Sequence, residues 1–214
     1  MVIYSLNKGK CILIEINPLE QTERDNYKLL IGTVVPRPIA FITSEAIDGT
    51  INGAPFSYFN VVTADPPMLS VSIQRKNDRQ KDTAKNILAK GNFVIHIVSK
   101  DYVEKINQTA ASLAEDESEI TLASLTLAPS THISTPGIEE AKVRYECVME
   151  QHLPLGSDGQ VTTDFFIAKV QIMHIAEEVY DDGKIVYEEL AAMSRLAGND
   201  YAEIGDITSI KRPD

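Results

Sequence analysis

The chain has 214 residues, of which 43% are hydrophobic and 24% are charged, a composition typical of one globular domain spanning residues 1–214. Thirty-one acidic residues outnumber twenty Lys and Arg residues, and the net charge of −11 argues against nucleic acid or an anionic membrane surface as the main partner. No apolar run approaches the ~20 residues that cross a bilayer and residues 1–15 lack a signal-peptide layout, so we expect a cytoplasmic protein with Cys11 and Cys147 reduced.

The predicted elements are mostly strands. Residues 34–43 form an apolar run that contains Pro36 and Pro38, which lack an N–H and therefore favour an edge strand or a bulge. The turn signal Asp48-Gly49 precedes a predicted strand at residues 54–62. Further strands are predicted at residues 68–74, 92–99, 141–153 and 163–176, and Asp182-Gly183 closes a last hairpin.

Two helices are predicted between the strands. Residues 82–90 begin at Asp82, which we interpret as the capping residue, and end before Gly91. Residues 101–111 follow, with Val103, Ile106 and Ala110 predicted to face inward. Because the strands outnumber the helices and are not each followed by one, the pattern favours an antiparallel Greek-key barrel with attached helices over a doubly wound parallel sheet.

Several motifs that would define a chemistry are absent from the sequence. It lacks the Rossmann glycine fingerprint, the P-loop and the Gly-x-Ser-x-Gly elbow. The four histidines are never four residues apart or beside a cysteine pair, so no metal site is predicted. The acidic run at residues 115–119 lacks the ligand spacing of a calcium loop and is interpreted as a solvated loop.

A basic segment stands out in this acidic chain. Residues 74–90 contain six Lys or Arg residues and two Asp residues, at the point where a helix begins. Backbone N–H groups at a helix start, together with nearby cations, predict an anion-binding site. A solubilising basic loop is the alternative.

A second segment, at residues 52–60, combines small residues, short polar side chains and three aromatic residues. Small residues let the backbone approach a flat ligand, Asn52 and Ser57 offer hydrogen bonds, and aromatic rings can flank a ligand ring. The alternative is an ordinary strand start with core aromatic residues.

An ordered set of motifs resembles the flavin reductase-like, FMN-binding split-barrel family, which includes the flavin reductase component of nitrilotriacetate monooxygenase, flavoredoxins and ferric reductases. The set includes Val34-Val35-Pro36-Arg37-Pro38, Asp48-Gly49, Ala54-Pro55-Phe56-Ser57, Asp65-Pro66-Pro67, Lys81-Asp82-Thr83, Glu146-Cys147 and Arg195-Leu196-Ala197-Gly198. The resemblance covers about residues 27–213.

The chain also departs from the family pattern in three places. His96 stands where relatives commonly have Asn, and Ala197 replaces a usual Gly. Residues 115–134 differ most, in a region that helps to shape the substrate mouth in relatives.

The resemblance implies a homodimer with FMN at the subunit interface. The cofactor-binding residues that it implies are Arg37, Thr43, Ser44, Asn52, Ala54, Ser57, Lys81, Asp82, Thr83 and Arg195. Arg195 would come from the partner copy or else form a surface ion pair. His174 would act as the catalytic residue near the nicotinamide or the ring edge, or else is a packed strand histidine.

The function implied by the resemblance is hydride transfer from NAD(P)H to flavin, with electrons passing to free flavin, ferric iron or a partner monooxygenase. Since no Rossmann fingerprint is present, the nicotinamide is expected to dock transiently as a substrate. Two alternatives are an FMN electron-transfer protein without nicotinamide activity and a non-enzymatic split-barrel module that binds another ligand, such as haem.

Overall fold

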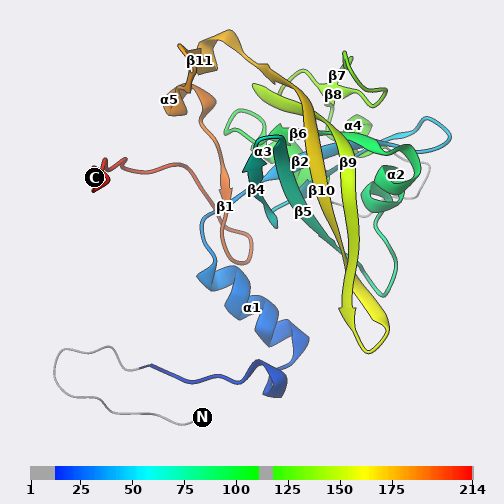
Figure 1. The fold of residues 1–214 in the computed structure, drawn as a ribbon, viewed down its shortest axis with the longest axis vertical. Coiled ribbons are helices and arrows are strands. Elements are labelled where there is room, and N and C mark those ends of the chain that lie inside the picture. The colour runs from blue at the N-terminus through cyan, green and yellow to red at the C-terminus, as the bar shows by residue number, and fades with distance from the viewer. Residues whose placement is uncertain (1–12, 111–117, 214) are drawn as a thin grey trace.

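An antiparallel barrel forms the body of the protein in a computed structural model that describes residues 13–110 and 118–213 (Figure 1). Its main sheet has the strand order β3-β2-β6-β9-β10-β5-β4, and every neighbouring pair is antiparallel. These strands are β2 (Ala40–Glu45), β3 (Ile51–Phe56), β4 (Phe59–Ala64), β5 (Pro67–Gln74), β6 (Asn92–Ile97), β9 (Val143–Ser157) and β10 (Gln160–Ile175). The expected antiparallel, mainly β fold class is confirmed.

Short strands complete the structure at the ends of the barrel. A three-stranded sheet joins β1 (Arg37–Pro38), β13 (Ser194–Arg195) and β14 (Tyr201–Ala202). Two hairpins pair β7 (Leu127–Ala128) with β8 (Gly137–Ile138), and β11 (Tyr180–Asp181) with β12 (Lys184–Ile185). The last of these is the hairpin predicted at Asp182-Gly183.

The predicted strand at residues 34–43 is two elements. Pro38 lies in β1, at the edge of the small sheet, as its missing N–H requires. From Ala40 the chain enters β2, a central strand between β3 and β6. The predicted strand at residues 54–62 is likewise divided, because β3 ends at Phe56 and β4 begins at Phe59 on the opposite edge of the sheet.

Two hydrophobic clusters explain why β2 reads as a continuous apolar run. Ala40 and Ile42 belong to the cluster inside the barrel, whereas Ile39 and Phe41 belong to a second cluster that includes Ile106 of α3 and Ile120 of α4. Since both faces of β2 are buried, the sequence shows no polar alternation there.

The helices are α1 (Glu23–Thr33), α2 (Asp82–Lys90), α3 (Val103–Gln108), α4 (Glu119–Leu122) and α5 (Tyr187–Leu190), with 3₁₀ turns at Pro18–Glu20 and Glu177–Val179. Within the described ranges, none of these helices has both the length and the apolar character needed to cross a bilayer. In Figure 1, α1 lies beside one end of the barrel, and β1 is the next element along the sequence.

Two details of the helix prediction are wrong. The N-cap of α2 is Lys81, and Asp82 is the first helical residue, whose carboxylate instead accepts a 2.9 Å hydrogen bond from Lys85 Nζ one turn along. Ala110 is exposed, because α3 ends at Gln108 and the helical period no longer applies. The predicted end of α2 is confirmed, since Gly91 adopts the left-handed conformation at φ 72°.

Candidate functional site

Two adjoining cavities contain all the predicted cofactor-binding residues except Thr43 and Ser44. The basic cavity has a volume of about 440 Å³ and is lined by Asn52, Ala54, Pro55, Lys76, Asn77, Arg79, Gln80, Lys81, Asp82, Thr83, Lys85, Thr109, Ala110 and Glu119. The arginine cavity has a volume of about 210 Å³ and is lined by Tyr27, Ile31, Arg37, Pro55, Phe56, Ser57, Tyr58, Ser72, Gln74, Lys81, Arg195, Leu196 and Gly198. Pro55 and Lys81 line both cavities and so mark their junction.

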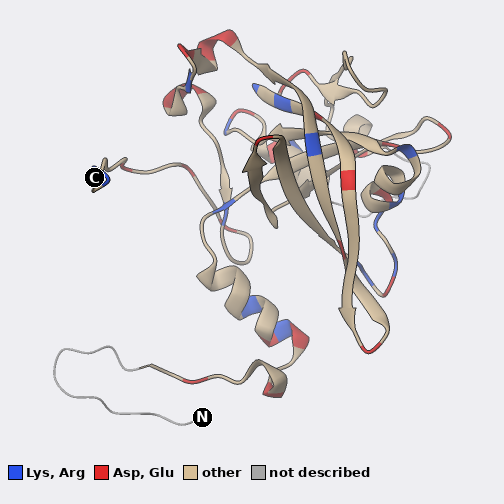
Figure 2. Cartoon of the chain, viewed as in Figure 1, with Lys and Arg blue, Asp and Glu red and all other residues tan. Residues whose placement is uncertain are grey.

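Cations dominate the basic cavity. It is lined by Lys76, Arg79, Lys81 and Lys85, against the carboxylates of Asp82 and Glu119. Figure 2 shows these positive residues on α2 and on the loop before it. Burial, and then the charge of Lys76, lower the pKa of Lys81, whose Nζ lies 5.4 Å from the centroid of the Phe56 ring. A bound anion would relieve this crowding of positive charge.

A buried carboxylate anchors the basic loop to the barrel. Asp164 on β10 is fully buried and accepts two 2.9 Å hydrogen bonds from the Arg75 guanidinium. It also bonds Gln80 Nε2 at 3.0 Å and His152 Nε2 at 2.9 Å. Burial raises the pKa of Asp164, but these bonds outweigh it and hold the pKa below its usual value. Arg75 and Gln80, at the two ends of the loop, are therefore both bound to the carboxylate of Asp164.

The remaining predicted residues, Thr43 and Ser44 on β2, do not line either cavity. Thr83 Oγ1 donates to Asn52 Oδ1 at 2.8 Å, and Asn86 Nδ2 donates to Ser44 Oγ at 3.2 Å. Thr43 is fully buried and its hydroxyl donates to the carbonyl of Pro136 at 2.6 Å. The hydroxyl groups of Thr43 and Ser44 are therefore engaged in hydrogen bonds within the protein.

The interpretation of residues 115–119 as a solvated loop is wrong at Glu119; residues 115–117 lie outside the described part of the chain. Glu119 is 8% exposed, and its Oε2 accepts hydrogen bonds from Asn52 Nδ2 at 2.9 Å and from the N–H of Gly53 at 3.3 Å. A run of acidic residues is usually exposed to solvent, and the burial of Glu119 becomes visible only in the folded structure.

In the arginine cavity, Arg37 acts as a structural clamp. Its guanidinium donates to the carbonyls of Ile31 at 2.7 Å and Val34 at 2.6 Å, at the end of α1. It also donates to the carbonyl of Leu196 at 2.8 Å, near the other end of the chain. Arg195 lies 4.4 Å from the centroid of the Tyr201 ring and donates to the carbonyl of Gly198 at 2.5 Å. Both guanidinium groups thus shape the wall of the cavity.

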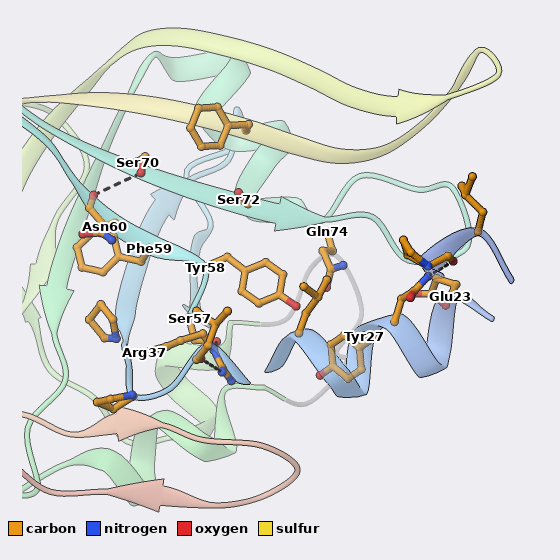
Figure 3. A pocket seen from close by; sticks show the side chains of 18 residues that line it. Glu23, Tyr27, Arg37, Ser57, Tyr58, Phe59, Asn60, Ser70, Ser72 and Gln74 are labelled. Carbon is orange, nitrogen blue, oxygen red and sulfur yellow. Dashed lines mark hydrogen bonds between the residues drawn. The ribbon is translucent and has the colours of Figure 1, made fainter. Parts of the chain in front are cut away.

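A third, larger cavity opens from the arginine cavity, with which it shares Tyr27, Arg37, Ser57, Tyr58, Ser72 and Gln74. We call it the apolar cavity; it has a volume of about 860 Å³. Figure 3 shows Tyr27 of α1 on one side and Ser70 and Ser72 of β5 on the other. The side chains of Leu19, Leu30, Val34, Phe59 and Phe165 make most of its remaining lining apolar.

The predicted catalytic residue, His174, lies away from these cavities. Its Nε2 is 2.7 Å from Oε1 of Glu146, on the neighbouring strand β9, and it lines none of the cavities above. His96 is fully buried between the carbonyl of Phe41, 2.9 Å from Nδ1, and the N–H of Ile138, 3.0 Å from Nε2. His96 is thus part of the barrel wall.

The fold is thus an antiparallel split barrel with a basic cavity beside a second, aromatic-lined cavity. A family profile described as "Flavin reductase like domain" matches residues 31–191, and the chain belongs to this family.

Individual relatives agree with this assignment. An uncharacterized protein, YwrF of Bacillus subtilis, is 50% identical over 193 residues, which are 89% of this chain and 94% of that protein. The crystal structure of nitrilotriacetate monooxygenase component B from Bacillus cereus is 50% identical, with a TM-score of 0.92, covering 94% of this chain and 100% of that one. That of the Pseudomonas fluorescens 2-nitrobenzoate 2-nitroreductase NbaA is 28% identical, with a TM-score of 0.80, covering 94% and 96%.

The sequence reasoning missed α1 and Glu119 as parts of the site. The α1 residues Tyr27 and Ile31 line the arginine cavity. A signal for α1 was present, because Thr22 accepts from the N–H of Asp25 and donates to its carboxylate, a reciprocal cap with recognisable spacing. For Glu119, no local pattern indicates that it is buried.

Proposed function

We propose that this protein is a cytoplasmic, homodimeric flavin reductase that binds FMN and takes hydride from NAD(P)H. The observation that carries the proposal is the junction at Lys81 and Pro55, where a cavity lined by four cationic side chains meets one lined by aromatic, hydroxyl and arginine side chains. A ligand that combines a flat ring system with a phosphate would match this arrangement, with its phosphate in the basic cavity and its ring in the arginine cavity. The shared family and the likeness to nitrilotriacetate monooxygenase component B support it.

The donor chemistry of the basic cavity fits the phosphate of FMN. Lys76, Arg79, Lys81 and Lys85 would hold the dianion against the repulsion of a chain with net charge −11. The N-cap residue of α2, Lys81, makes no side-chain cap hydrogen bond, so an anion could accept from the N–H groups of the first turn. Asp82 would not cap this helix or touch the phosphate.

The ring would lie in the arginine cavity, where Ser57 offers a hydroxyl group for hydrogen bonding and Pro55 and Phe56 offer van der Waals contact. When bound, FMN supplies hydride acceptance from NAD(P)H and the release of two electrons to an acceptor. The protein places the ring, holds the phosphate and limits water at the site. Arg37 and Arg195 keep the cavity wall in shape through their bonds to Leu196 and Gly198.

Exposed apolar side chains beside the site support a homodimer. Leu29, Leu30 and Val34 at the end of α1 are 41%, 60% and 58% exposed, and the last two line the apolar cavity. A second copy packed against this face would bury them and cover the ring. If His174 takes part in the reaction, it must do so at the site of a neighbouring copy, because it lines none of these three cavities of its own copy. The monooxygenase component of similar sequence supports a partner monooxygenase as one destination of the electrons.

Titration of the flavin-free protein with FMN and with riboflavin tests the phosphate site. We expect FMN to bind much more tightly, and equal affinities would refute the site.

Anaerobic mixing of the FMN-loaded protein with NADH or NADPH should bleach the flavin absorbance. Absence of bleaching by both nucleotides would indicate an FMN electron-transfer protein without nicotinamide activity. Light scattering should give the mass of a dimer, and a monomer with bound FMN would contradict the interface.

A further inference from the structure

Glu119 places a buried carboxylate in the wall of a cavity otherwise suited to anions. It lines both the basic cavity and a neighbouring cavity of about 420 Å³ that also contains Asp48, Asp82 and Lys85. Its Oε2 accepts from Asn52 Nδ2 and from the N–H of Gly53, so the carboxylate is bound to β3 by two hydrogen bonds. A negative group in this position opposes the function of the four cations and requires an explanation.

The surrounding chain fixes Glu119 in place. Ser118 Oγ donates to the carbonyl of Ile51 at 2.6 Å, immediately before the Glu119 contacts with Asn52 and Gly53. Ile120 packs so closely against Gly53 that a Cβ added to Gly53 would lie 2.6 Å from Cδ1 of Ile120. Residues 118–120 thus contact residues 51–53 of β3 in order. Glu119 therefore has little freedom to rotate into solvent.

The carboxylate also determines which way the Asn52 amide points. Because Nδ2 of Asn52 donates to Glu119, its Oδ1 faces the opposite side and accepts from Thr83 Oγ1 at 2.8 Å. Thr83 is 1% exposed and lies in the first turn of α2. Glu119 therefore acts on the helix start through one intervening amide.

The charges facing Glu119 come from three elements. Asp82 and Lys85 belong to α2, Lys76, Arg79 and Lys81 belong to the preceding loop, and Asp48 lies in the turn before β3. Burial, together with the charge of Asp82, raises the pKa of Glu119 above its usual value, although the bonds from Gly53 and Asn52 act in the opposite direction. A dianion in the basic cavity adds negative charge and favours the protonated carboxyl further.

We propose that Glu119 is a positioning residue, which orients the Asn52 amide toward Thr83, and that binding of a phosphate dianion in the basic cavity is coupled to uptake of a proton by its carboxyl. The proposal rests on the proposed function, which places the FMN phosphate in this cavity. The proton comes from solvent and resides on Oε1, so that Oε2 keeps accepting from Asn52 and Gly53. No bond other than this O–H forms or breaks.

The test compares Glu119→Gln with Glu119→Ala. Glutamine keeps an oxygen that accepts from Asn52 and Gly53 but cannot take up a proton, whereas alanine removes the acceptor. FMN affinity is measured from pH 5.5 to 8.5, and proton uptake is obtained from titration calorimetry in two buffers of different ionisation enthalpy. Glu188→Gln, at an exposed residue of α5, is the matched control for loss of one negative charge.

We expect Glu119→Gln to bind FMN about three- to tenfold more tightly than the wild type at pH 8, with the difference vanishing toward low pH and with less proton uptake. Glu119→Ala should bind FMN more weakly than Glu119→Gln, and Glu188→Gln should match the wild type. Riboflavin affinity should not change in Glu119→Gln. The ionisation of the phosphate itself affects every variant equally and cancels in the comparison.

Equal proton uptake by the wild type and Glu119→Gln would overturn the coupling. Equal weakening of FMN by the Gln and Ala variants would overturn the positioning role. These failures differ from failure of the proposed function, in which the wild type itself would bind FMN no better than riboflavin.

Discussion

Nε2 of His174 lies 2.7 Å from Oε1 of Glu146, diagonally across the β9–β10 pair, in which the residue opposite His174 is Arg144. Glu146 is 1% exposed and also accepts 2.7 Å hydrogen bonds from the N–H groups of Thr131 and His132. One carboxylate therefore joins the long hairpin to the segment at residues 131–132. That segment lies within residues 115–134, which the sequence resemblance leads us to expect to depart most from the family pattern.

The acid stability of the protein should depend on Glu146. Burial raises the pKa of this carboxyl, but the bonds from Thr131, His132 and His174 outweigh it and lower the pKa to about 2. Because the folded-state pKa is lowered from 4.5, the carboxylate stabilises the fold above pH ~4.5, and this contribution is lost as the pH falls toward 2.

Urea unfolding of Glu146→Gln should give a free energy of unfolding about 1–3 kcal/mol lower than the wild type at pH 7, with the gap closing below pH ~4. Glu150→Gln, at an exposed position of the same strand, is the control and should match the wild type. A constant gap at every pH would show that Glu146 acts through packing alone.

Replacement of His174 tests its proposed catalytic role. His174→Asn should slow reduction of bound flavin by NAD(P)H by about tenfold or more and leave FMN affinity unchanged, because His174 lines neither the basic, the arginine nor the apolar cavity of its own copy. Stopped-flow absorbance under anaerobic conditions measures the rate. If reduction is as fast as in the wild type, His174 is only the partner of Glu146.

Charge reversal at Lys81 should weaken FMN binding. Lys81→Glu removes an attraction and adds a repulsion at the junction of the two cavities, and we expect affinity to fall about ten- to a few hundredfold. Lys76 cannot serve as the control for this variant, because it also lines the basic cavity.

Lys184→Glu, at an exposed residue of β12, is the better control because it makes the same change of net charge elsewhere. Fluorescence titrations at two salt concentrations separate local contact from the general field of the protein. Equal weakening by both variants, seen only at low salt, would rule out the phosphate anchor.

Loss of the Arg37 guanidinium should destabilise the protein. Arg37→Ala leaves the carbonyls of Ile31, Val34 and Leu196 without this donor, and we expect the free energy of unfolding to fall by about 2–4 kcal/mol. Arg37→Lys should recover only part of it, since one ammonium cannot match the planar fork. Chemical denaturation measures both, and an unchanged midpoint in Arg37→Ala would show that these bonds contribute little.

His96 should remain neutral in the folded protein at pH values well above 3. Burial lowers its pKa to about 3, although the bond to the Phe41 carbonyl acts in the opposite direction. With Nδ1–H donating to Phe41 and Nε2 accepting from Ile138, one neutral tautomer satisfies both bonds.

The unfolded chain takes up a proton at this residue near pH 6.5, so the contribution of His96 to stability is lost as the pH falls from about 6.5 toward 3. Nitrogen NMR shifts of the ring at pH 5 should show an unprotonated Nε2. His132, which is exposed, supplies the comparison, and an imidazolium signal for His96 in the folded protein would contradict the assignment.

The sequence predicted best those features that repeat along the chain. Alternation placed the hairpin of β9 and β10, and the basic segment indicated the cavity around Lys81, because both signals extend over many residues. The sequence did not predict those features that depend on contacts between residues far apart in the chain. The apolar run at residues 34–43 hides the change from β1 to β2, and Glu119 is buried only because Asn52 and Gly53 receive it.

The bond from Arg37 to the Leu196 carbonyl has a consequence for biosynthesis. These residues are 159 positions apart, so a ribosome must add at least 159 residues after Arg37 before the wall of the arginine cavity can be completed. An emerging chain presents the cations of residues 75–85 much earlier than Arg195 and Gly198. Until those last residues emerge, any cofactor recruited by the cations would be held by its phosphate alone, with the ring side of the pocket still unfinished.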